Sequence, residues 1–320
     1  MEALKFIVKK LAAFAVSIAA LSFIIFSLLY LAPGDPARVL AGARRVDPAI
    51  LESIRDQYHL NDSFFSQYFR WVDNALHLDF GNSIRTGAPV TDTVAPHLAV
   101  SLELVLVSLA LSVLFGILFG VLAAKRRGKL SDKAINVVAL VGTSAPSFAA
   151  GLLLLYVFAL TFGWFPVYGI GDGSFGDTIL HLTLPALALT IGVSALLMKV
   201  TRSAMLNEVD SDYTVFLRAR AISPLKITAA QLKNAAGPIL TSMGLVLASL
   251  IGATVLVETT FAIPGVGNLL ASSVTMKDVP VVQFLTLVLA FFICLSSAVV
   301  DIAVYFINPA ARAGRKRGAL

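Results

Sequence analysis

Long apolar runs alternate with shorter polar segments along the whole chain. A transmembrane helix needs about 20 largely apolar residues. Six windows reach that length: Leu11–Ala32, Leu98–Ala124, Ala134–Phe162, Leu182–Val200, Pro238–Val257 and Val281–Ile307. Because lipid offers no partner to backbone N–H and C=O groups, each window is predicted to be helical, with Pro146 interrupting the third and Pro185 near the start of the fourth. The pattern predicts an all-α integral membrane protein with six transmembrane helices.

The first window follows three lysines, as the apolar region of a secretory signal peptide would. It is too long for that region, however, and it ends in "APGDPA" and not in a cleavage site of small residues. We therefore predict that residues 1–32 form a cytoplasmic N-terminus and a retained first span.

Composition agrees with lipid as the main solvent. Hydrophobic residues make up 58% of the 320 residues and charged residues only 14%, whereas a soluble domain carries about 25% charged residues. The net charge of +6 would suit nucleic acid, but the basic residues lie in short blocks between apolar runs, so we predict no nucleic-acid partner. The single cysteine, Cys294, lies in an apolar run and permits no intrachain disulfide.

The basic blocks predict the orientation of the spans. The short segments on one side hold five Lys and Arg in Lys125–Lys133 and six from Lys199 to Lys233. Those on the other side hold none in Gly163–His181 and one in Thr259–Pro280. Because cytoplasmic loops are enriched in Lys and Arg, both termini are predicted to be cytoplasmic.

The polar segments differ in size. Residues 33–97 are predicted to form a small extracytoplasmic helical subdomain, in which "DPAILESIRDQYHL" offers Asp47 as an N-cap and Pro48 at the first helical position. It serves either as a lid over the span ends or as a docking surface for a delivery protein. Residues 98–308 form a five-span core and residues 309–320 a basic cytoplasmic tail, while the Gly-rich segment Gly163–His181 is predicted to consist of turns.

The cytoplasmic segment 201–237 is longer than a linker requires and is predicted to contain two short helices. In the first, about Tyr213 to Ala221, the side chains of Tyr213, Phe216 and Leu217 share one face, with Arg218 and Arg220 beside them. Ser223 is predicted to cap the second helix, with Pro224 at its first position. From this pattern alone, a basic amphipathic helix lying on anionic lipid remains an alternative.

Catalytic motifs do not emerge. The chain lacks the G-x-x-x-x-G-K-[ST] phosphate loop, so any ATP hydrolysis by that chemistry must occur on a partner. The histidines have no metal-ligand spacing and fall in predicted outside segments: His59, His77, His97 and His181. We predict no catalytic residue, no metal site and no cofactor in this chain. A membrane-embedded hydrolase would need a nucleophile constellation that the sequence does not offer.

Several motifs resemble one family. The stretch "DYTVFLRARAISPLKITAAQLKNAAGPILT" is similar to the EAA loop of membrane subunits of bacterial ABC importers, which in the peptide-importer branch reads D-Y-x-x-x-A-R-A-K-G-x-S and then R-N-A-x-x-P. Further stretches fit the same branch in the same order: "LAPGDPA" (Leu31–Ala37), "HLTLPALAL" (His181–Leu189), "TRSAML" (Thr201–Leu206), "VETTFAIPGVGNLL" (Val257–Leu270) and "DIAVYFINPAAR" (Asp301–Arg312). The chain is identified as a member of the oligopeptide and dipeptide importer permeases, with the type I importer fold.

The resemblance implies the partners and the location. Such permeases lie in the bacterial cytoplasmic membrane, pair with a second homologous permease and sit on two ATP-binding subunits or domains, which carry ATP and Mg²⁺. An extracytoplasmic substrate-binding protein delivers the solute, which is an oligopeptide or dipeptide or, in other members, glutathione or a nickel chelate. An ion-driven secondary transporter would want inverted repeats and a midplane ion site, and the sequence has neither.

The resemblance also implies which residues couple the permease to the ATPase. These are Asp212, Tyr213, Phe216, Leu217, Arg218, Ala219, Arg220, Ala221, Ser223, Pro224 and Asn234. One of them departs from the pattern, because Ala221 stands where the family has glycine. Glycine tolerates a positive φ, whereas alanine there is disfavoured, so the turn is either ordinary or strained.

Three acidic residues lie in or beside the spans: Glu103, Glu258 and Asp301. Charges in lipid are costly and usually face a cavity or a partner. Glu258 belongs to a matched motif, and we predict that Glu258 and Asp301 lie at a gate or a subunit interface. Solvation at the membrane surface is the alternative.

Overall fold

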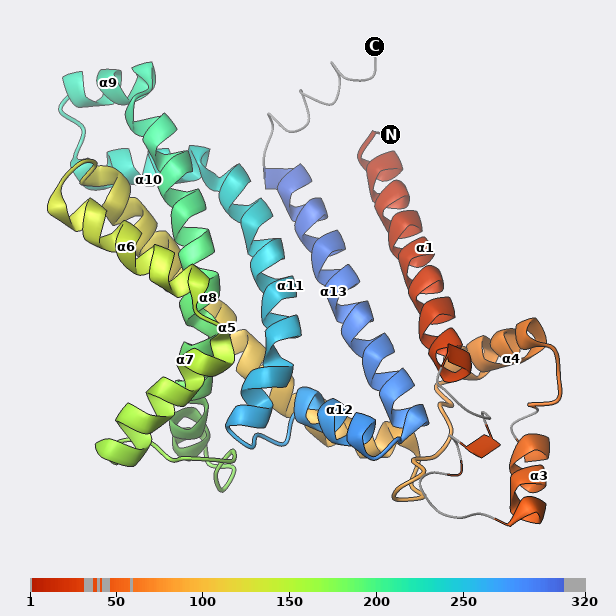
Figure 1. Ribbon diagram of the computed structural model, residues 1–320. Helices are drawn as coiled ribbons and strands as arrows, with labels where there is room; N and C mark the ends of the chain where they lie inside the picture. Colours follow the sequence, from red (N-terminus) through yellow and green to blue (C-terminus); the bar gives the residue numbers. More distant parts are fainter. Residues whose placement is uncertain (1, 32–36, 39–40, 42–46, 58–59, 308–320) are drawn as a thin grey trace. The chain divides into compact units, whose positions relative to one another are not determined.

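The computed structural model describes residues 2–31, 37–38, 41, 47–57 and 60–307. Regular secondary structure among these residues is helical, apart from one isolated bridge between Asn82 and Pro89 (Figure 1). Residues 32–36 of the first matched motif, His59 and the basic tail 309–320 lie outside the described residues.

The helix bounds follow the apolar pattern with longer ends than the hydropathy windows. A window detects only the apolar middle, whereas backbone hydrogen bonds continue into polar turns on either side. The helices are α1 (Glu2–Leu31), α3 (Pro48–Gln57), α4 (Phe64–Leu76), α5 (Val90–Lys125), α6 (Leu130–Ser144), α7 (Ser147–Leu154) with a π-helical continuation (Leu155–Thr161), α8 (Phe175–Val209), α9 (Asp212–Ala219), α10 (Pro224–Asn234), α11 (Ala236–Thr260), α12 (Val266–Thr275) and α13 (Val279–Ile307).

Five helices are long and apolar enough to cross a membrane, namely α1, α5, α8, α11 and α13. They confirm five of the six windows. The third window is instead a bent pair: α6 and α7 pass the same test together but turn by 107° at the break between Ser144 and Ser147. Ala145 is extended, with φ −84° and ψ 123°, as the residue before a proline favours. Pro146 thus predicts the break, while packing against the neighbouring helices sets the angle.

The interpretation of Gly163–His181 as turns is wrong for its last third. Gly163, Gly169, Gly171 and Gly173 do have positive φ, but α8 begins at Phe175. The first turns of α8 are polar enough to escape a hydropathy window, yet they are hydrogen-bonded as a helix. By contrast, the Asp47 prediction is confirmed, because its Oδ1 accepts from the N–H of Ala49 at 3.1 Å.

The helices form two compact units. The first comprises Met1–Glu103 and Ala262–Cys294, and the second comprises Leu104–Phe261 and Leu295–Leu320. The first unit contains α12, which lies in the segment Thr259–Pro280 that was predicted only as an outside loop. A helix of ten residues is too short to register as an apolar window, so its buried face becomes evident only in the packed unit.

The core of the first unit joins α5, α12 and α13. Its buried residues are Val90, Val94, Val266, Leu269, Val281 and Leu285. Beside it, the carboxylate of Asp278 is 3% exposed and accepts hydrogen bonds from the hydroxyl of Ser83 and from the N–H groups of Ile84 and Arg85. This carboxylate ties the loop before α5 to the turn before α13.

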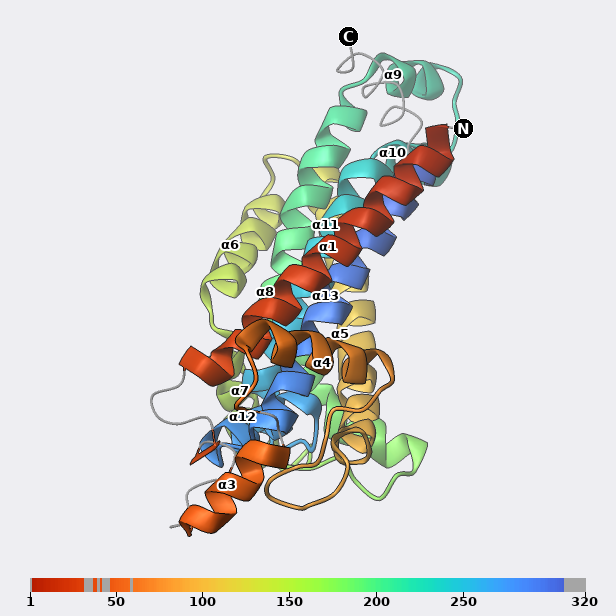
Figure 2. The ribbon, with the colours of Figure 1, turned by 90° about the vertical axis from the view of Figure 1, so that its right-hand side faces the viewer.

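In the second unit, α8 packs against α6, α7 and α11 (Figures 1 and 2). Small residues permit close approach to it. A methyl group on Gly120 would lie 2.6 Å from Cβ of Thr201, and one on Gly116 would lie 2.7 Å from Cγ of Leu197. Helices in lipid gain association energy from such contacts, because lipid tails are as apolar as the side chains they would replace.

A buried ion pair joins the start of α6 to α8. Arg202 donates from Nε to Oδ1 of Asp132 at 2.7 Å and from Nη2 to Oδ2 at 2.8 Å. The Asp132 side chain is 5% exposed and also accepts from the N–H of Gly128 and from Asn136. This bidentate geometry satisfies the carboxylate away from water, which is the condition under which a buried pair is tolerated.

A second ion pair joins the α5–α6 turn to the end of α8 at the surface. Arg127 follows the end of α5, and its Nη1 lies 2.8 Å from Oδ2 of Asp210, at the end of α8. Both side chains are more than half exposed, so water screens their attraction. The two pairs therefore offer a comparison between a buried carboxylate and an exposed one, both in ion pairs with arginine.

We predict that Asp132→Ala lowers the free energy of unfolding by about 1.5–3 kcal/mol, because it removes a buried, charged acceptor and leaves the partly buried Arg202 and the N–H of Gly128 without it. The control, Asp210→Ala, is expected to cost at most about 1 kcal/mol, since it removes an exposed pair. Thermal unfolding of the purified protein in detergent, followed by circular dichroism, measures both. Equal shifts in the two midpoints would contradict the structural weight given to Asp132.

Candidate functional site

The helices α9 and α10 follow the end of α8 and form a short helical pair (Figure 1). The first was predicted from Tyr213 to Ala221 and is observed from Asp212 to Ala219. The second begins at Pro224, directly after Ser223, as predicted. The Ser223 hydroxyl makes no capping hydrogen bond, so the capping part of that prediction is wrong; the carbonyl of Ser223 instead accepts from the N–H of Ile227 at 3.1 Å.

Buried polar contacts tie the pair to α8. The carbonyl oxygen of Glu208 accepts from the hydroxyls of Ser211 at 2.6 Å and Thr214 at 2.7 Å. Gln231 of α10 donates from Nε2 to Oγ1 of Thr214 at 3.1 Å. Thr214 is fully buried and Gln231 is 2% exposed, so these bonds form away from water, where losing one partner is costly.

Sequence reasoning missed Thr214, Gln231 and Glu208. One signal was available for Gln231, which lies four residues after Ile227 and therefore on the same side of α10. Ile227 is buried, so a polar residue on its stripe had to find a partner inside the protein. Thr214 carries no comparable signal, because its neighbours in the sequence are of mixed polarity.

Tyr213 joins the two ends of the matched loop. Its hydroxyl donates to Oε2 of Glu208 at 2.7 Å, and the side chain of Asn234, at the end of α10, also interacts with it. Burial raises the pKa of the Tyr213 phenol above its ordinary value, and the hydrogen bond to Glu208 raises the pKa further. The phenol therefore stays protonated and acts as a donor that fixes α9 against α8.

The outer side of the pair is exposed and combines apolar with basic side chains. Phe216 is 58% exposed, and the guanidinium of Arg220 lies 5.4 Å from the centre of its ring. Tyr213, Phe216 and Leu217 share one face of α9 as predicted, but Tyr213 and Leu217 are half-buried and only Phe216 is exposed. The other exposed members of the predicted set are Asp212, Arg218, Ala219, Arg220, Ala221, Ser223, Pro224 and Asn234.

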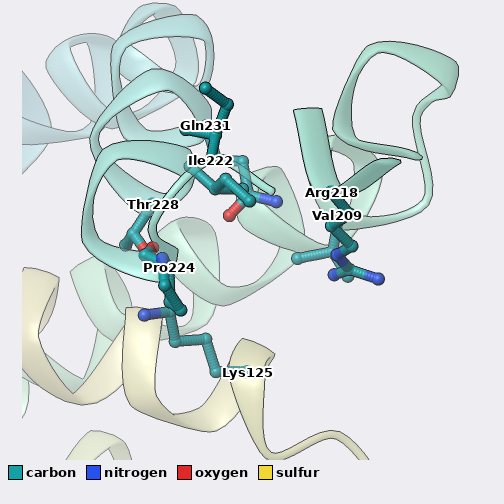
Figure 3. Close-up of a pocket in the computed structure, with 8 residues that line it drawn as sticks. Lys125, Val209, Arg218, Ile222, Pro224, Thr228 and Gln231 are labelled. Carbon is teal, nitrogen blue, oxygen red and sulfur yellow. The ribbon is translucent and has the colours of Figure 1, made fainter. Parts of the chain in front are cut away.

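Between this pair and the end of α5 lies a cavity of about 360 Å³. Its lining residues are Lys125, Val209, Arg218, Ile222, Pro224, Ile227, Thr228 and Gln231. Figure 3 shows Lys125 entering from the end of α5, with Arg218 on the opposite side of the opening from Pro224 and Thr228. Two cations at an otherwise mostly apolar opening favour a partner that carries acidic and apolar groups together.

Ala221 has φ +54°, in the left-handed region. Its N–H donates to the carbonyl of Arg218 at 2.9 Å, and the N–H of Ile222 donates to the carbonyl of Leu217 at 3.2 Å, which close the end of α9. Of the two alternatives for this turn, the strained one is observed. An alanine side chain at positive φ crowds the following carbonyl oxygen, which is why glycine is the easier residue here.

The acidic residues of the spans are placed differently from one another. Glu258 is fully buried near the end of α11, so no surface of its side chain is left for interfacial water to reach. Asp301 is half-buried in α13, and Glu103 is exposed in α5. Their roles at a gate or interface stay predictions. Across the part of the chain that the structure describes, no group of three or more His, Cys, Asp or Glu is arranged to hold a metal.

Comparison with known proteins gives matches along nearly the whole chain. The family described as "Binding-protein-dependent transport system inner membrane component" matches residues 116–313, and its N-terminal component matches residues 3–105. The chain is 34% identical over 310 residues to the glutathione transport system permease protein GsiC of Escherichia coli (strain K12), covering 97% of this chain and 99% of the relative. It is 35% identical over 310 residues to the probable peptide ABC transporter permease protein y4tP of Sinorhizobium fredii (strain NBRC 101917 / NGR234), covering 96% and 99%.

A solved structure shares the fold. It is the MetNI methionine ABC transporter in an inward-facing conformation, with a TM-score of 0.56 and 16% identity over 67% of this chain and 96% of the other chain. At that identity the likeness concerns the fold.

We predict that Ala221→Gly stabilises the turn between α9 and α10. The substitution removes about 1–2 kcal/mol of strain from the left-handed backbone conformation. Part of this gain, about 0.4–1 kcal/mol, is lost because glycine increases the conformational entropy of the unfolded chain. Slower hydrogen exchange of the α9 and α10 amides would report the gain. The control is Ala219→Gly, two residues earlier in helical conformation, which is expected to speed exchange because glycine weakens a helix by about 0.5–1 kcal/mol. Faster exchange in both variants would show that the positive φ carries no strain.

Proposed function

Because the chain belongs to the binding-protein-dependent transport system inner membrane components, we propose that it is the permease subunit of an ATP-driven peptide importer and that the α9–α10 pair couples it to ATP-binding subunits. The observation that carries the coupling proposal is the two-sided character of the pair. One side is bound to α8 by buried hydrogen bonds, and the other exposes Phe216, Arg218 and Leu225. Such a pair suits the transfer of force from a protein partner better than contact with lipid alone.

The attachment to α8 supports a lever-like motion. Helix α8 runs without interruption from Phe175 to Val209. Thr214 of α9 donates to the carbonyl of Glu208 near its end, and Gln231 ties α10 to Thr214. A displacement of the outer surface is therefore passed to α8 as a whole, since breaking the buried bonds would leave polar groups without partners. ATP binding can favour one arrangement of the spans only if the partner binds the pair more tightly in that arrangement.

The proposed assembly contains a second homologous permease, two ATP-binding subunits or domains with ATP and Mg²⁺, and an extracytoplasmic substrate-binding protein. The excess of Lys and Arg in the segments that contain α9 and α10 supports a cytoplasmic position for the pair, which is where ATP is available. The chain lies in the bacterial cytoplasmic membrane with both termini inside.

Peptides are the proposed solutes, and glutathione is the second candidate. The probable peptide permease and the glutathione permease are similar to this chain at 35% and 34% identity over the same length. Glutathione is itself a small peptide-like thiol, so the two candidates share amide and carboxylate chemistry. Uptake of labelled dipeptides and glutathione by cells that contain the complete transporter separates them.

Coupling is tested at Arg218. We predict that Arg218→Ala lowers solute uptake per ATP hydrolysed by the reconstituted transporter, because the exposed guanidinium contributes to the ATPase contact. Lys233→Ala is the control, since Lys233 is an exposed cation near the end of α10 and is not among the predicted coupling residues. Both variants should retain the thermal stability of the unchanged protein. An unaltered ratio of uptake to hydrolysis in Arg218→Ala would argue against coupling through this surface.

Orientation is tested with fusions of alkaline phosphatase, which is active only outside the cytoplasm. Truncation and fusion after Asp79 is expected to give an active enzyme, and fusion after Gly128 an inactive one, because the two residues lie in segments on opposite sides of the membrane. Activity at Gly128 would reverse the proposed topology.

A further inference from the structure

Helix α4 carries two separate apolar stripes. The first packs against α1: the rings of Phe23 and Tyr68 have centroids 5.2 Å apart, those of Phe26 and Trp71 are 5.8 Å apart, and Phe64 contacts both α1 rings. Edge-on aromatic contacts of this kind stabilise a helix pair beyond the area they bury. This stripe explains why α4 is held on α1, and it uses only one side of the helix.

The second stripe is exposed. Phe65, Phe69 and Leu76 recur at intervals of four and seven residues, which places them along one side of α4, and they are 62%, 67% and 78% exposed. Polar residues, including Ser66, Arg70 and Asn74, occupy the remaining circumference of the helix, with Asn74 nearly opposite the exposed stripe. Leaving three large apolar side chains in water on a 13-residue helix would forgo the gain that burial brings.

The attachment point lies within the apolar part of α1. The hydroxyl of Tyr68 lies 2.9 Å from Oγ of Ser22 and 3.4 Å from the carbonyl oxygen of Ala19. Both α1 residues fall inside the candidate span Ala3–Ser27. Ser22 precedes the helix end at Leu31 by nine residues, which corresponds to about 14 Å along the axis at 1.5 Å per residue.

Most of the apolar part of α1 is left uncovered by the protein. Only 17% of its most apolar window is buried within the protein. Figures 1 and 2 both show α4 lying crosswise on α1, toward the end away from the N-terminus. Helix α4 crosses α1 at a level where α1 is still apolar. One long side of α4 therefore faces along the membrane normal.

We propose that α4 is an interfacial helix and that the stripe of Phe65, Phe69 and Leu76 inserts into the outer leaflet of the bilayer. Amphipathic helices lie in the interface with the apolar side in the acyl region and the polar side in water. Aromatic residues are enriched at that level. Arg70 and Asp62 form an ion pair at 3.0 Å, and each of the two side chains is about 40% exposed. The pair therefore remains hydrated on the polar side of α4.

Lipid is the occupant that the observations favour, because α4 is attached at Ser22, within a candidate span of which only 17% of the most apolar window is buried in the protein. Its consequence is mechanical: α4 holds the extracytoplasmic subdomain flat on the membrane while its other stripe holds α1. The inference rests on the proposed orientation, which puts α4 on the outer side of the membrane, and it stands independently of coupling through α9 and α10.

Spin labels on single cysteines test the insertion. The background is Cys294→Ser in the full chain, assembled with its partner subunits in lipid nanodiscs without a binding protein. Phe69→Cys and Leu76→Cys place labels on the stripe, and Ser66→Cys and Asn74→Cys place matched controls on exposed positions of the same helix. Collision of each label with oxygen, which concentrates in hydrocarbon, is compared with collision with a water-soluble nickel chelate.

Labels at positions 69 and 76 are expected to collide more with oxygen than with the nickel chelate, and labels at positions 66 and 74 are expected to do the reverse. Dominant nickel collisions at all four positions would overturn the proposal, since the stripe would then lie in water. Low collision rates with both agents at 69 and 76 would also overturn it, because a second permease subunit would then cover the stripe. The same assay after addition of a binding protein should leave positions 69 and 76 unchanged.

Discussion

The carbonyl of one residue, Glu208, holds the α9–α10 pair to the end of α8. It accepts hydrogen bonds from Ser211 and Thr214, and Gln231 continues the chain of bonds into α10. Thr214 and Gln231 are buried, so water cannot readily replace a bond that either one loses. The proposed conversion of ATP chemistry into movement of the spans depends on this attachment more than on any exposed charge.

The same helix is the centre of the second unit, for a related reason. Where lipid is the solvent, helices gain little from hiding apolar side chains from one another, so association depends on close contact and on paired polar groups. Gly116 and Gly120 supply the contact with α8. Asp132 and Arg202 supply the paired polar groups at the end near α6. Together they make α8 the element to which the α5–α6 turn and the α9–α10 pair are both attached.

Much of the site could be predicted from the sequence. The length of the apolar runs predicts five of the spans. Proline's fit to a first helical position predicts the helix start at Pro224, and comparison with the family pattern singles out Ala221. The helical period places Tyr213, Phe216 and Leu217 on one side of α9 as observed, but it does not say how deeply each is buried: Phe216 is 58% exposed and the other two are half-buried. Thr214 and Gln231 were missed, since a polar side chain reveals a buried role only when its partner from another helix is known.

The sequence by itself was enough to establish lipid as the solvent, the number of apolar segments, the break at Pro146 and the family. Each of these depends on local composition or on short motifs. The 107° bend, the helix α12, the strain at Ala221 and the second apolar stripe of α4 emerged only once the helices were packed. Each of these depends on contacts between residues far apart in the chain or on the one side of a helix that packing leaves open. A linear pattern carries the periodicity of a helix, whereas its rotation about its own axis is decided by the neighbours it meets.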